Sequence, residues 1–196
     1  MTPWIGILVS RKAAMDKIRN PLFTDISPFD SGESYQPGDW RKVHEIVHDE
    51  TTIRGFFGDY RWLSNFSNAT VMLDRVEYQS TERAYQASKW KPEDRSFFAG
   101  CTNRQSVAFN RENQPNGYTQ EEWDAIKLSV MQFLLEQKFD PLLNPEPAQK
   151  LQQTGARYIE ETNWWNDTFW GKNLAGEGEN NLGKLLMKMR SHYASF

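Results

Sequence analysis

The clearest periodic pattern lies between residues 121 and 139, where apolar side chains recur three or four positions apart. That spacing places side chains on one face of an α-helix. Thr119 followed by Glu122 is a capping box, which marks where the helix begins. We predict a core helix here, with Met131 as a packing residue and a buried face made of Trp123, Ile126, Val130, Phe133, Leu134 and Phe139.

Shorter patterns surround this helix and predict one domain without internal repeats. Turn and cap residues separate helices expected over residues 81–89, 92–100, 103–113, 145–155 and 181–193, and Gly155 would close the fourth in a left-handed cap. Residues 51–58 and 156–161 are typical of strands, and residues 69–80 of a hairpin that turns at Asp74 and Arg75.

The first 53 residues differ from the rest of the chain. A strand is expected at residues 2–10 and a helix at residues 11–20, followed by an irregular stretch that contains three prolines. The segment 40–50 fits a strand or a helix equally well. We expect residues 1–53 to be an extension that wraps a main domain formed by residues 54–196.

Composition narrows the possible functions. The net charge of -3 and pI near 5.7 argue against a dedicated sequence-reading nucleic-acid binder. One cysteine and three histidines favour neither a disulfide nor a metal site, so we expect no metal and no cofactor. The apolar run at residues 4–9 is too short to span a membrane and precedes its basic residues, the reverse of a signal peptide, which predicts a cytoplasmic protein without membrane contact.

The helix expected after Tyr78 has an unusual distribution of side chains. Glu82, Tyr85, Gln86 and Lys89 are three, four and seven positions apart and therefore share one face, whereas the opposite side carries only small residues. Ser80 or Thr81 would cap it. This face could bind a ligand, with Glu82 and Lys89 as reactive groups, or it could be an ordinary solvated surface with polar pairs.

Three further stretches could complete a binding site. The segment Asp167–Gly171 could place a carboxylate beside Trp170, or it could be an aromatic plug over the core. The amides that open the last helix could bind phosphate, or the loop before that helix could simply be flexible. Phe57 or Trp62 could stack on a base while Ser64 and Asn65 bind sugar or phosphate, or these rings could equally be buried core aromatics. The residues concerned are Phe57, Gly58, Trp62, Ser64, Asn65, Trp170, Gly171, Asn180, Gly183 and Lys184.

Five motifs, occurring in order, resemble those of the NADAR family: GDYRWLSNF, YQSTERAYQASK, WDAIKLSVMQFLLEQKF, IEET followed by DTFWG, and NNLGKLLMKMR. The resemblance covers residues 54–190. It implies a mainly helical (α+β) domain with a small antiparallel sheet, an acid at Glu82, an amine at Lys89, and Asp167 with Trp170 closing the pocket. Two features depart from the family: Asn110-Arg111 stands where relatives usually have Gly-Arg, and the extension has no counterpart in minimal members.

The resemblance also implies an activity. The family is linked to NAD and ADP-ribose metabolism and includes N-glycosidases of riboflavin-pathway intermediates and enzymes that remove ADP-ribose from modified guanine in nucleic acid. We therefore expect a hydrolase that cleaves a ribose–base bond. Trp164 and Trp165 favour ADP-ribose or an ADP-ribosylated guanine nucleotide as the ligand. The alternatives are a riboflavin-intermediate glycosidase and a module that binds ADP-ribose without cleaving it.

Two mechanisms fit this activity. Glu82 could stabilise positive charge at the sugar C1 and exchange protons, with Asp167 as the second carboxylate. Alternatively, a neutral Lys89 could attack C1 and form an iminium intermediate. Desolvation would favour the neutral amine, whereas a nearby Glu82 would keep the amine charged, and the sequence leaves this conflict open.

Overall fold

The computed structural model describes residue 46 and residues 48–193. The strand expected at residues 2–10, the helix expected at residues 11–20 and nearly all of the extension lie outside these residues. No helix in the described part of the chain is long and apolar enough to cross a membrane.

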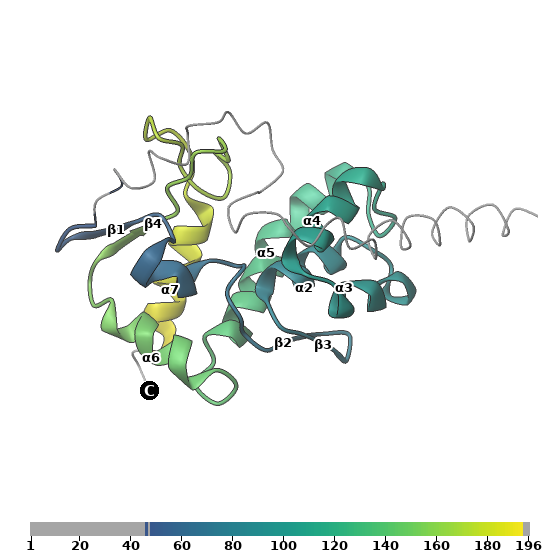
Figure 1. Cartoon of the computed structure of the whole chain (residues 1–196), viewed down its shortest axis with the longest axis horizontal. Coiled ribbons are helices and arrows are strands. Elements are labelled where there is room, and N and C mark those ends of the chain that lie inside the picture. Colours follow the sequence, from purple (N-terminus) through teal and green to yellow (C-terminus); the bar gives the residue numbers. More distant parts are fainter. Residues whose placement is uncertain (1–45, 47, 194–196) are drawn as a thin grey trace, which may run out of the picture.

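The longest helix, α5 (Gln120–Lys138), lies between two groups of elements (Figure 1). The first group contains α2 (Thr81–Ser88), η4 (Pro92–Asp94), α3 (Ser96–Gly100), α4 (Asn103–Glu112) and the hairpin of β2 (Val71–Leu73) and β3 (Val76–Tyr78). The second contains β1 (Thr52–Arg54), η3 (Gly58–Leu63), α6 (Pro145–Gln153), β4 (Tyr158–Glu160) and α7 (Asn181–Tyr193). The expected mainly helical α+β domain with a small antiparallel sheet is confirmed.

The strands form two separate pairs. β2 and β3 are antiparallel and turn at Asp74 and Arg75, whose φ angles of 49° and 65° are the left-handed values that a tight hairpin requires. β1 and β4 are parallel, with Ile53 opposite Ile159. Nothing in the local pattern predicted this second pair, because a parallel pair needs a long connection and here joins segments about a hundred residues apart.

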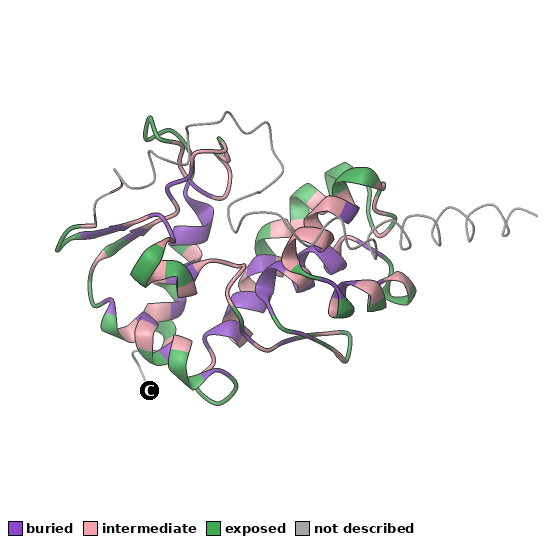
Figure 2. Cartoon of the chain, viewed as in Figure 1, coloured by how far each residue is buried: buried purple, intermediate pink, exposed green. Residues whose placement is uncertain are grey.

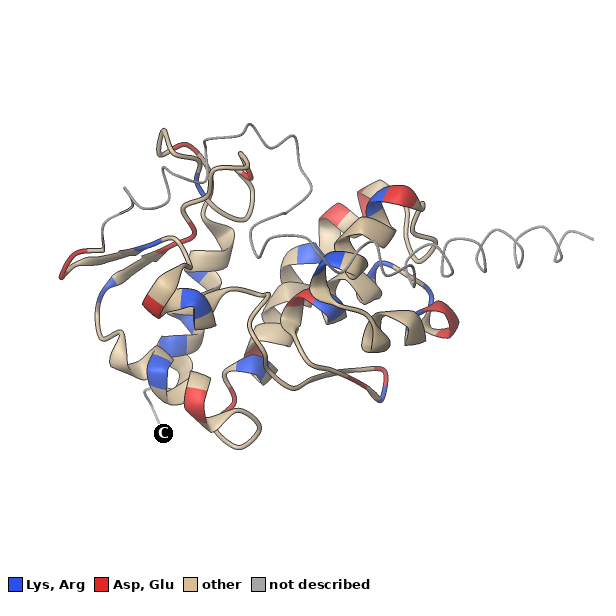
Figure 3. Cartoon of the chain, in the orientation of Figure 1, with Lys and Arg blue, Asp and Glu red and all other residues tan. Residues whose placement is uncertain are grey.

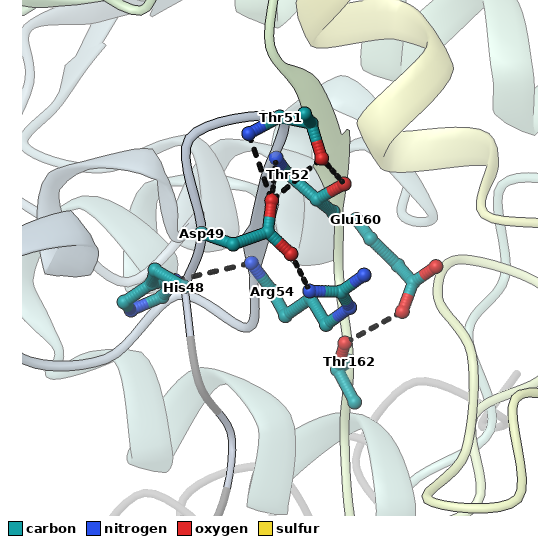
Figure 4. Close-up of polar contacts among 7 residues, drawn as sticks. All are labelled: His48, Asp49, Thr51, Thr52, Arg54, Glu160 and Thr162. Atoms are coloured by element: carbon teal, nitrogen blue, oxygen red, sulfur yellow. Dashed lines mark hydrogen bonds and ion pairs between the residues drawn. The ribbon is translucent and has the colours of Figure 1, made fainter.

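Asp49 organises the entry to β1. One of its carboxylate oxygens accepts hydrogen bonds from the amides of Thr51 and Thr52, and the other accepts from Arg54 at 2.6 Å (Figure 4). His48 Nδ1 accepts from the Arg54 amide, so this imidazole is used in holding the strand. On the neighbouring strand, Glu160 accepts a hydrogen bond from Thr162.

The buried face of α5 differs from the predicted one. Met131, Leu134, Leu135 and Lys138 are almost completely buried, whereas Phe133 is 49% exposed, so its prediction as a core residue is wrong (Figure 2). The helix has apolar residues around most of its circumference in this region, and several overlapping stripes satisfy helical periodicity. The choice among them comes from α2 and α7, which pack against α5 from different directions.

Lys138 is an unusual core residue, because its side chain is fully buried without a carboxylate partner among the described contacts. Its Nζ donates to the backbone oxygens of Leu63 at 3.2 Å and Ser64 at 2.7 Å. Burial lowers the pKa of Lys138 to about 7, and the charge of Arg61 acts in the same direction. This lysine therefore joins α5 to the segment that leads into Asn65.

Helix α2 lies inside the molecule, not on its surface. The Ser80 side chain accepts from the Arg83 amide and caps the first turn, as expected. Ala84 and Ala87, both fully buried, allow close packing against α4 and α5. The alternative of a solvated polar face on α2 is therefore wrong: Glu82, Tyr85 and Gln86 on its other side are each less than 10% exposed.

Candidate active site

A cavity of about 380 Å³ lies where α2, α4 and α5 meet the loop after β4, and we call it the central cavity. Its walls come from residues 57–66, from α2, from α4, from Met131 of α5 and from residues 161–170. Cavities of a few hundred cubic ångströms with converging polar groups are typical small-molecule sites. The predicted face of α2 forms one whole wall, because Glu82, Tyr85, Gln86 and Lys89 all line the central cavity.

Gln86 connects the acid and the amine on this wall. Its Nε2 donates to Glu82 Oε1 at 2.7 Å, and its Oε1 accepts from Lys89 Nζ at 2.9 Å. Glu82 and Lys89 form no ion pair with each other in the described part of the chain. The amide thus holds both side chains in place while keeping their charged groups apart.

Burial shifts the pKa values of both groups toward their neutral forms. Desolvation raises the pKa of Glu82; the hydrogen bond from Gln86 and the charge of Lys89 oppose this shift, whereas Asp167 adds to it. Desolvation also lowers the pKa of Lys89, with Glu82 opposing it. The lysine Nζ lies near the rings of Tyr85 and Trp123, 5.1 and 5.7 Å from their centroids. In the conflict that the sequence left open, desolvation therefore outweighs attraction to Glu82.

The loop from residue 163 to 170 brings Asp167 to the same cavity. Asn163 is fully buried; its Oδ1 accepts from the Asp167 amide, and its Nδ2 donates to the Asp167 carbonyl. Asp167 Oδ1 then accepts from the amides of Phe169 and Trp170, which closes a tight turn. Trp170 meets the ring of Tyr85 edge-on at 5.6 Å. Asp167 and Trp170 thus lie in one turn and both line the central cavity, with the carboxylate bonded to the Trp170 amide.

Glu161 is a third carboxyl group in the central cavity, and the sequence analysis did not select it. Its Oε2 is buried without a hydrogen-bond partner, and burial raises its pKa well above the ordinary value, with Asp167 and Glu82 acting in the same direction. Burial without a hydrogen-bond partner at Oε2 therefore favours the neutral acid at Glu161. Strand alternation could have found it: in the strand expected at residues 156–161, Glu161 is two positions after the buried Ile159 and so falls on the same side.

Aromatic and basic side chains complete the lining. Phe57 contacts Trp164, and Trp164 contacts Trp165, with ring centroids 5.2 and 4.8 Å apart. Arg61, Arg104 and Arg111 also line the central cavity. Elsewhere on the described chain, basic and acidic residues are interspersed along the helices (Figure 3), so these arginines belong to a local site, not to an extended basic surface.

The structure brings together most of the predicted site residues but not all of them. Those that line the central cavity are Phe57, Ser64, Asn65, Glu82, Tyr85, Gln86, Lys89, Asp167 and Trp170. Those that do not are Gly58, Trp62, Gly171, Asn180, Gly183 and Lys184. Trp62 packs edge-on against Phe139 in the core, with ring centroids 6.3 Å apart. Gly58, with φ of 51°, opens η3 and is exposed.

The start of α7 does not offer the free amides that a phosphate site needs. The amides of Asn181 and Leu182 donate to the carbonyls of Phe169 and Trp170, and Lys184 is exposed. Asn180 instead accepts from the Glu161 amide through its side chain. Gly171 and Gly183 are required for close packing, because a Cβ on either would lie 2.2 Å from a backbone oxygen. Asn180, Gly171 and Gly183 therefore pack against the backbone of residues 159–161, which carries Glu161, and do not line the central cavity.

Residues 48–193 contain no group of three or more histidine, cysteine, aspartate or glutamate side chains arranged to hold a metal ion.

Comparison with known proteins places this geometry in context. A family model described as the NADAR domain matches residues 33–193. "N-glycosidase YbiA" of Escherichia coli (strain K12) is 27% identical over 157 residues, which cover 79% of this chain and 95% of that protein. "Riboflavin biosynthesis protein VVA0006" of Vibrio vulnificus is 28% identical over 132 residues, 67% of this chain and 35% of that protein. The NMR structure of Escherichia coli YbiA superposes with a TM-score of 0.63 at 26% identity, covering 76% of this chain and 88% of that one.

Proposed function

Because this chain belongs to the NADAR domain family, as its motifs predicted, we propose that it is a hydrolase that cleaves the N-glycosidic bond between ribose C1 and a base. The observation that carries the proposal is the convergence of Lys89 with Glu82, Glu161 and Asp167 in the central cavity. A relative named as an N-glycosidase, aligned along most of both chains, supports the same reaction class.

Breaking the bond develops positive charge at C1 and negative charge on the departing base. Carboxyl groups in different environments can stabilise these two charges: a carboxylate stabilises the positive C1, and a carboxylic acid protonates the departing base. Glu82 and Glu161, whose pKa values are raised by burial, are suited to hold a proton for the departing base. Asp167, whose Oδ1 accepts a hydrogen bond from the Trp170 amide, is the carboxyl that we assign to the sugar side.

Lys89 is the nucleophile in the mechanism that we favour. Its neutral amine attacks C1 and the bond to the base breaks, the base leaving with the electron pair and a proton from a carboxylic acid. The amine then loses a proton, and the bond between C1 and the ring oxygen breaks as that oxygen takes the bonding electrons and a proton; this opens the ribose ring and produces an iminium between Nζ and C1. Water adds to the iminium, and collapse of the adduct releases the sugar and restores the lysine. The lowered pKa of Lys89 supports this route, because only the neutral amine is nucleophilic.

We further propose that the sugar is ADP-ribose, attached to guanine in a nucleotide or a nucleic acid. Two features support this choice. Arginine side chains suit phosphate oxygens, and Arg61, Arg104 and Arg111 line the same cavity as the acids. Phe57, Trp164 and Trp165 add flat surfaces on which an adenine or guanine ring can stack.

The runner-up substrate is a riboflavin-biosynthesis intermediate, which carries one phosphate. The Vibrio vulnificus relative named as a riboflavin biosynthesis protein favours it, although this chain spans about a third of that protein. A module that binds ADP-ribose without cleaving it is the remaining alternative, and the reactive groups at Glu82 and Lys89 count against it.

The experiment supplies the protein with an ADP-ribosylated guanosine oligonucleotide and, separately, with a riboflavin-biosynthesis intermediate. Chromatography and mass spectrometry then measure free ADP-ribose, or the released base and ribose phosphate. We expect ADP-ribose release by the wild type and at least a hundredfold slower release by Glu82→Gln. Cleavage of the riboflavin intermediate alone would select the runner-up, and binding of ADP-ribose without release from either compound would select the module.

A further inference from the structure

The amide of Gln86 lies between the proposed acid and the proposed nucleophile, and its orientation decides what each of them contacts. If its oxygen faces Lys89 and its nitrogen faces Glu82, both contacts are hydrogen bonds. If the amide is reversed, its oxygen faces the Glu82 carboxyl and its NH₂ faces the amine. Oxygen and nitrogen of an amide have nearly the same shape, so only the surrounding network can impose one orientation.

That network begins at Trp90, immediately after Lys89. The indole Nε1–H is a hydrogen-bond donor and never an acceptor. It donates to Asn110 Oδ1 at 2.5 Å, and this contact therefore requires the oxygen of Asn110 to face the indole. The NH₂ of Asn110 is then directed at Gln86, where it donates to the backbone oxygen at 3.1 Å and to Oε1 at 2.7 Å.

The orientation of the Asn110 amide determines which end of the Gln86 amide faces Lys89 and which faces Glu82. Because Gln86 Oε1 accepts from Asn110, it is also the end that accepts from Lys89, and Nε2 is the end that donates to Glu82. Oε1 is shared between two donors, so it is a weaker acceptor for a lysine ammonium than an unshared oxygen. One N–H of Lys89 is directed along this bond, which restricts the directions left for the amine lone pair.

We propose that Asn110 is a positioning residue that acts through Gln86, fixing its amide so that Lys89 is held by a neutral oxygen and kept out of an ion pair with Glu82. This inference rests on the proposed function, in which Lys89 reacts as a neutral amine. Asn110 does not line the central cavity, and its effect reaches the substrate only through Gln86 and Lys89.

The test replaces the donor of Asn110 with an acceptor. Asn110→Asp keeps the size of the side chain and the bond from Trp90, but its second oxygen repels Gln86 Oε1 and reverses the amide. It also places a negative charge within about 5.6 Å of Lys89 Nζ, judged from the two hydrogen bonds between them. At that distance, with an effective dielectric constant of about 20, the charge stabilises the ammonium by an amount equivalent to about two pH units.

The readout is the rate of covalent trapping as a function of pH. ADP-ribose in its open form presents an aldehyde at C1, which condenses with Lys89 and loses water; cyanoborohydride then delivers hydride to the iminium and leaves a stable secondary amine. Mass spectrometry of the intact protein measures the adduct. Asn113→Asp is the matched control, because it makes the same chemical change at the end of α4 at a side chain that bonds only to the Phe109 carbonyl among the contacts described.

The remaining titratable and charged groups around Lys89 are the same in all three proteins. They are Arg61 from η3, Glu82 and Tyr85 from α2, Arg104 and Arg111 from α4, Asp124 from α5, and Glu161 and Asp167 from the loop after β4. A shift confined to Asn110→Asp therefore reports the change at residue 110.

We expect the pH midpoint of trapping to rise by about two units in Asn110→Asp and to remain unchanged in Asn113→Asp. Adduct formation in the wild type with the same midpoint in Asn110→Asp would overturn the positioning role and leave the proposed function standing. No adduct in the wild type at any pH would overturn the lysine mechanism, and the inference with it.

If Asn110→Asp does not fold, Asn110→Ala tests the positioning role of Asn110 instead. It removes the donor without adding charge, so the Gln86 amide is free to turn. The maximal trapping rate should fall on the order of tenfold, as for the loss of one hydrogen bond, with calorimetric affinity for ADP-ribose unchanged. An unchanged rate, or equal losses in rate and affinity, would contradict a positioning role.

Discussion

Replacing Lys138 with methionine should remove a pH dependence from the stability of the protein. The folded state lowers the pKa of this lysine from 10.5 to about 7, so folding disfavours the charged form. Below pH 7 the group is charged in both states and the full penalty applies, about 5 kcal/mol for this shift. The penalty disappears as the pH approaches 10.5, where the unfolded chain also loses the proton. Stability from this residue therefore rises with pH.

The magnitude between two accessible pH values follows from the same two pKa values. The penalty is about 4 kcal/mol at pH 7 and about 2 kcal/mol at pH 9, so the wild type should gain about 2 kcal/mol relative to Lys138→Met over this interval. The substitution also removes the hydrogen-bond donor of the Leu63 and Ser64 carbonyls, which changes the absolute stability of the variant at every pH. The difference in slope is the measured quantity.

Urea unfolding followed by tryptophan fluorescence at pH 6, 7, 8 and 9 supplies the free energies of unfolding. Lys150→Met is the control, because Lys150 is 42% exposed and pairs with Glu146 on α6. A wild-type minus Lys138→Met difference that stays constant from pH 7 to 9 would refute the assignment of a largely neutral, buried lysine.

Three further predictions concern the central cavity. Glu82→Gln should fold normally and bind ADP-ribose, seen as a raised melting temperature, but turn over at least a hundredfold more slowly; wild-type turnover would contradict its role. Lys89→Arg should be inactive and form no borohydride adduct, because arginine cannot become neutral; retained activity would reduce Lys89 to a positioning group. Glu161→Gln should be more stable than the wild type at pH 7 and equally stable near pH 4. The reason is that the raised pKa of Glu161 contributes stability that is present below its unfolded pKa of 4.5 and is lost as the pH rises through its folded pKa. Equal melting temperatures of the two proteins at both pH values would show that Glu161 is not buried as a neutral acid.

The sequence by itself determined the local features of this protein. Capping residues and periodicity located α2, α5 and α7, and the offsets of three, four and seven placed Glu82, Gln86 and Lys89 on one face, as the structure has them. The hairpin turn at Asp74 and Arg75 was predictable for the same reason. Each of these features depends on residues within one or two turns of each other, where backbone geometry alone fixes who faces whom.

The tertiary structure decided which face is buried and against what. Helical periodicity allowed several buried stripes on α5, and contacts with α2 and α7 selected the one that excludes Phe133. The parallel pairing of β1 with β4 brings Glu161 to the acids, and the carbonyls of Phe169 and Trp170 occupy amides of α7 that a phosphate would need.

The chemistry of the site depends on the same long-range packing. Whether Lys89 is charged is a matter of how much water its neighbours exclude, and those neighbours come from α4, α5 and the loop after β4. The orientation of Gln86 depends on Asn110, which is 24 residues away in the chain. Desolvation and the direction of hydrogen bonds are properties of the packed environment, whereas the period of a helix is a property of the chain. For that reason the charge state of Lys89 and the orientation of Gln86 could be assigned only from the tertiary structure.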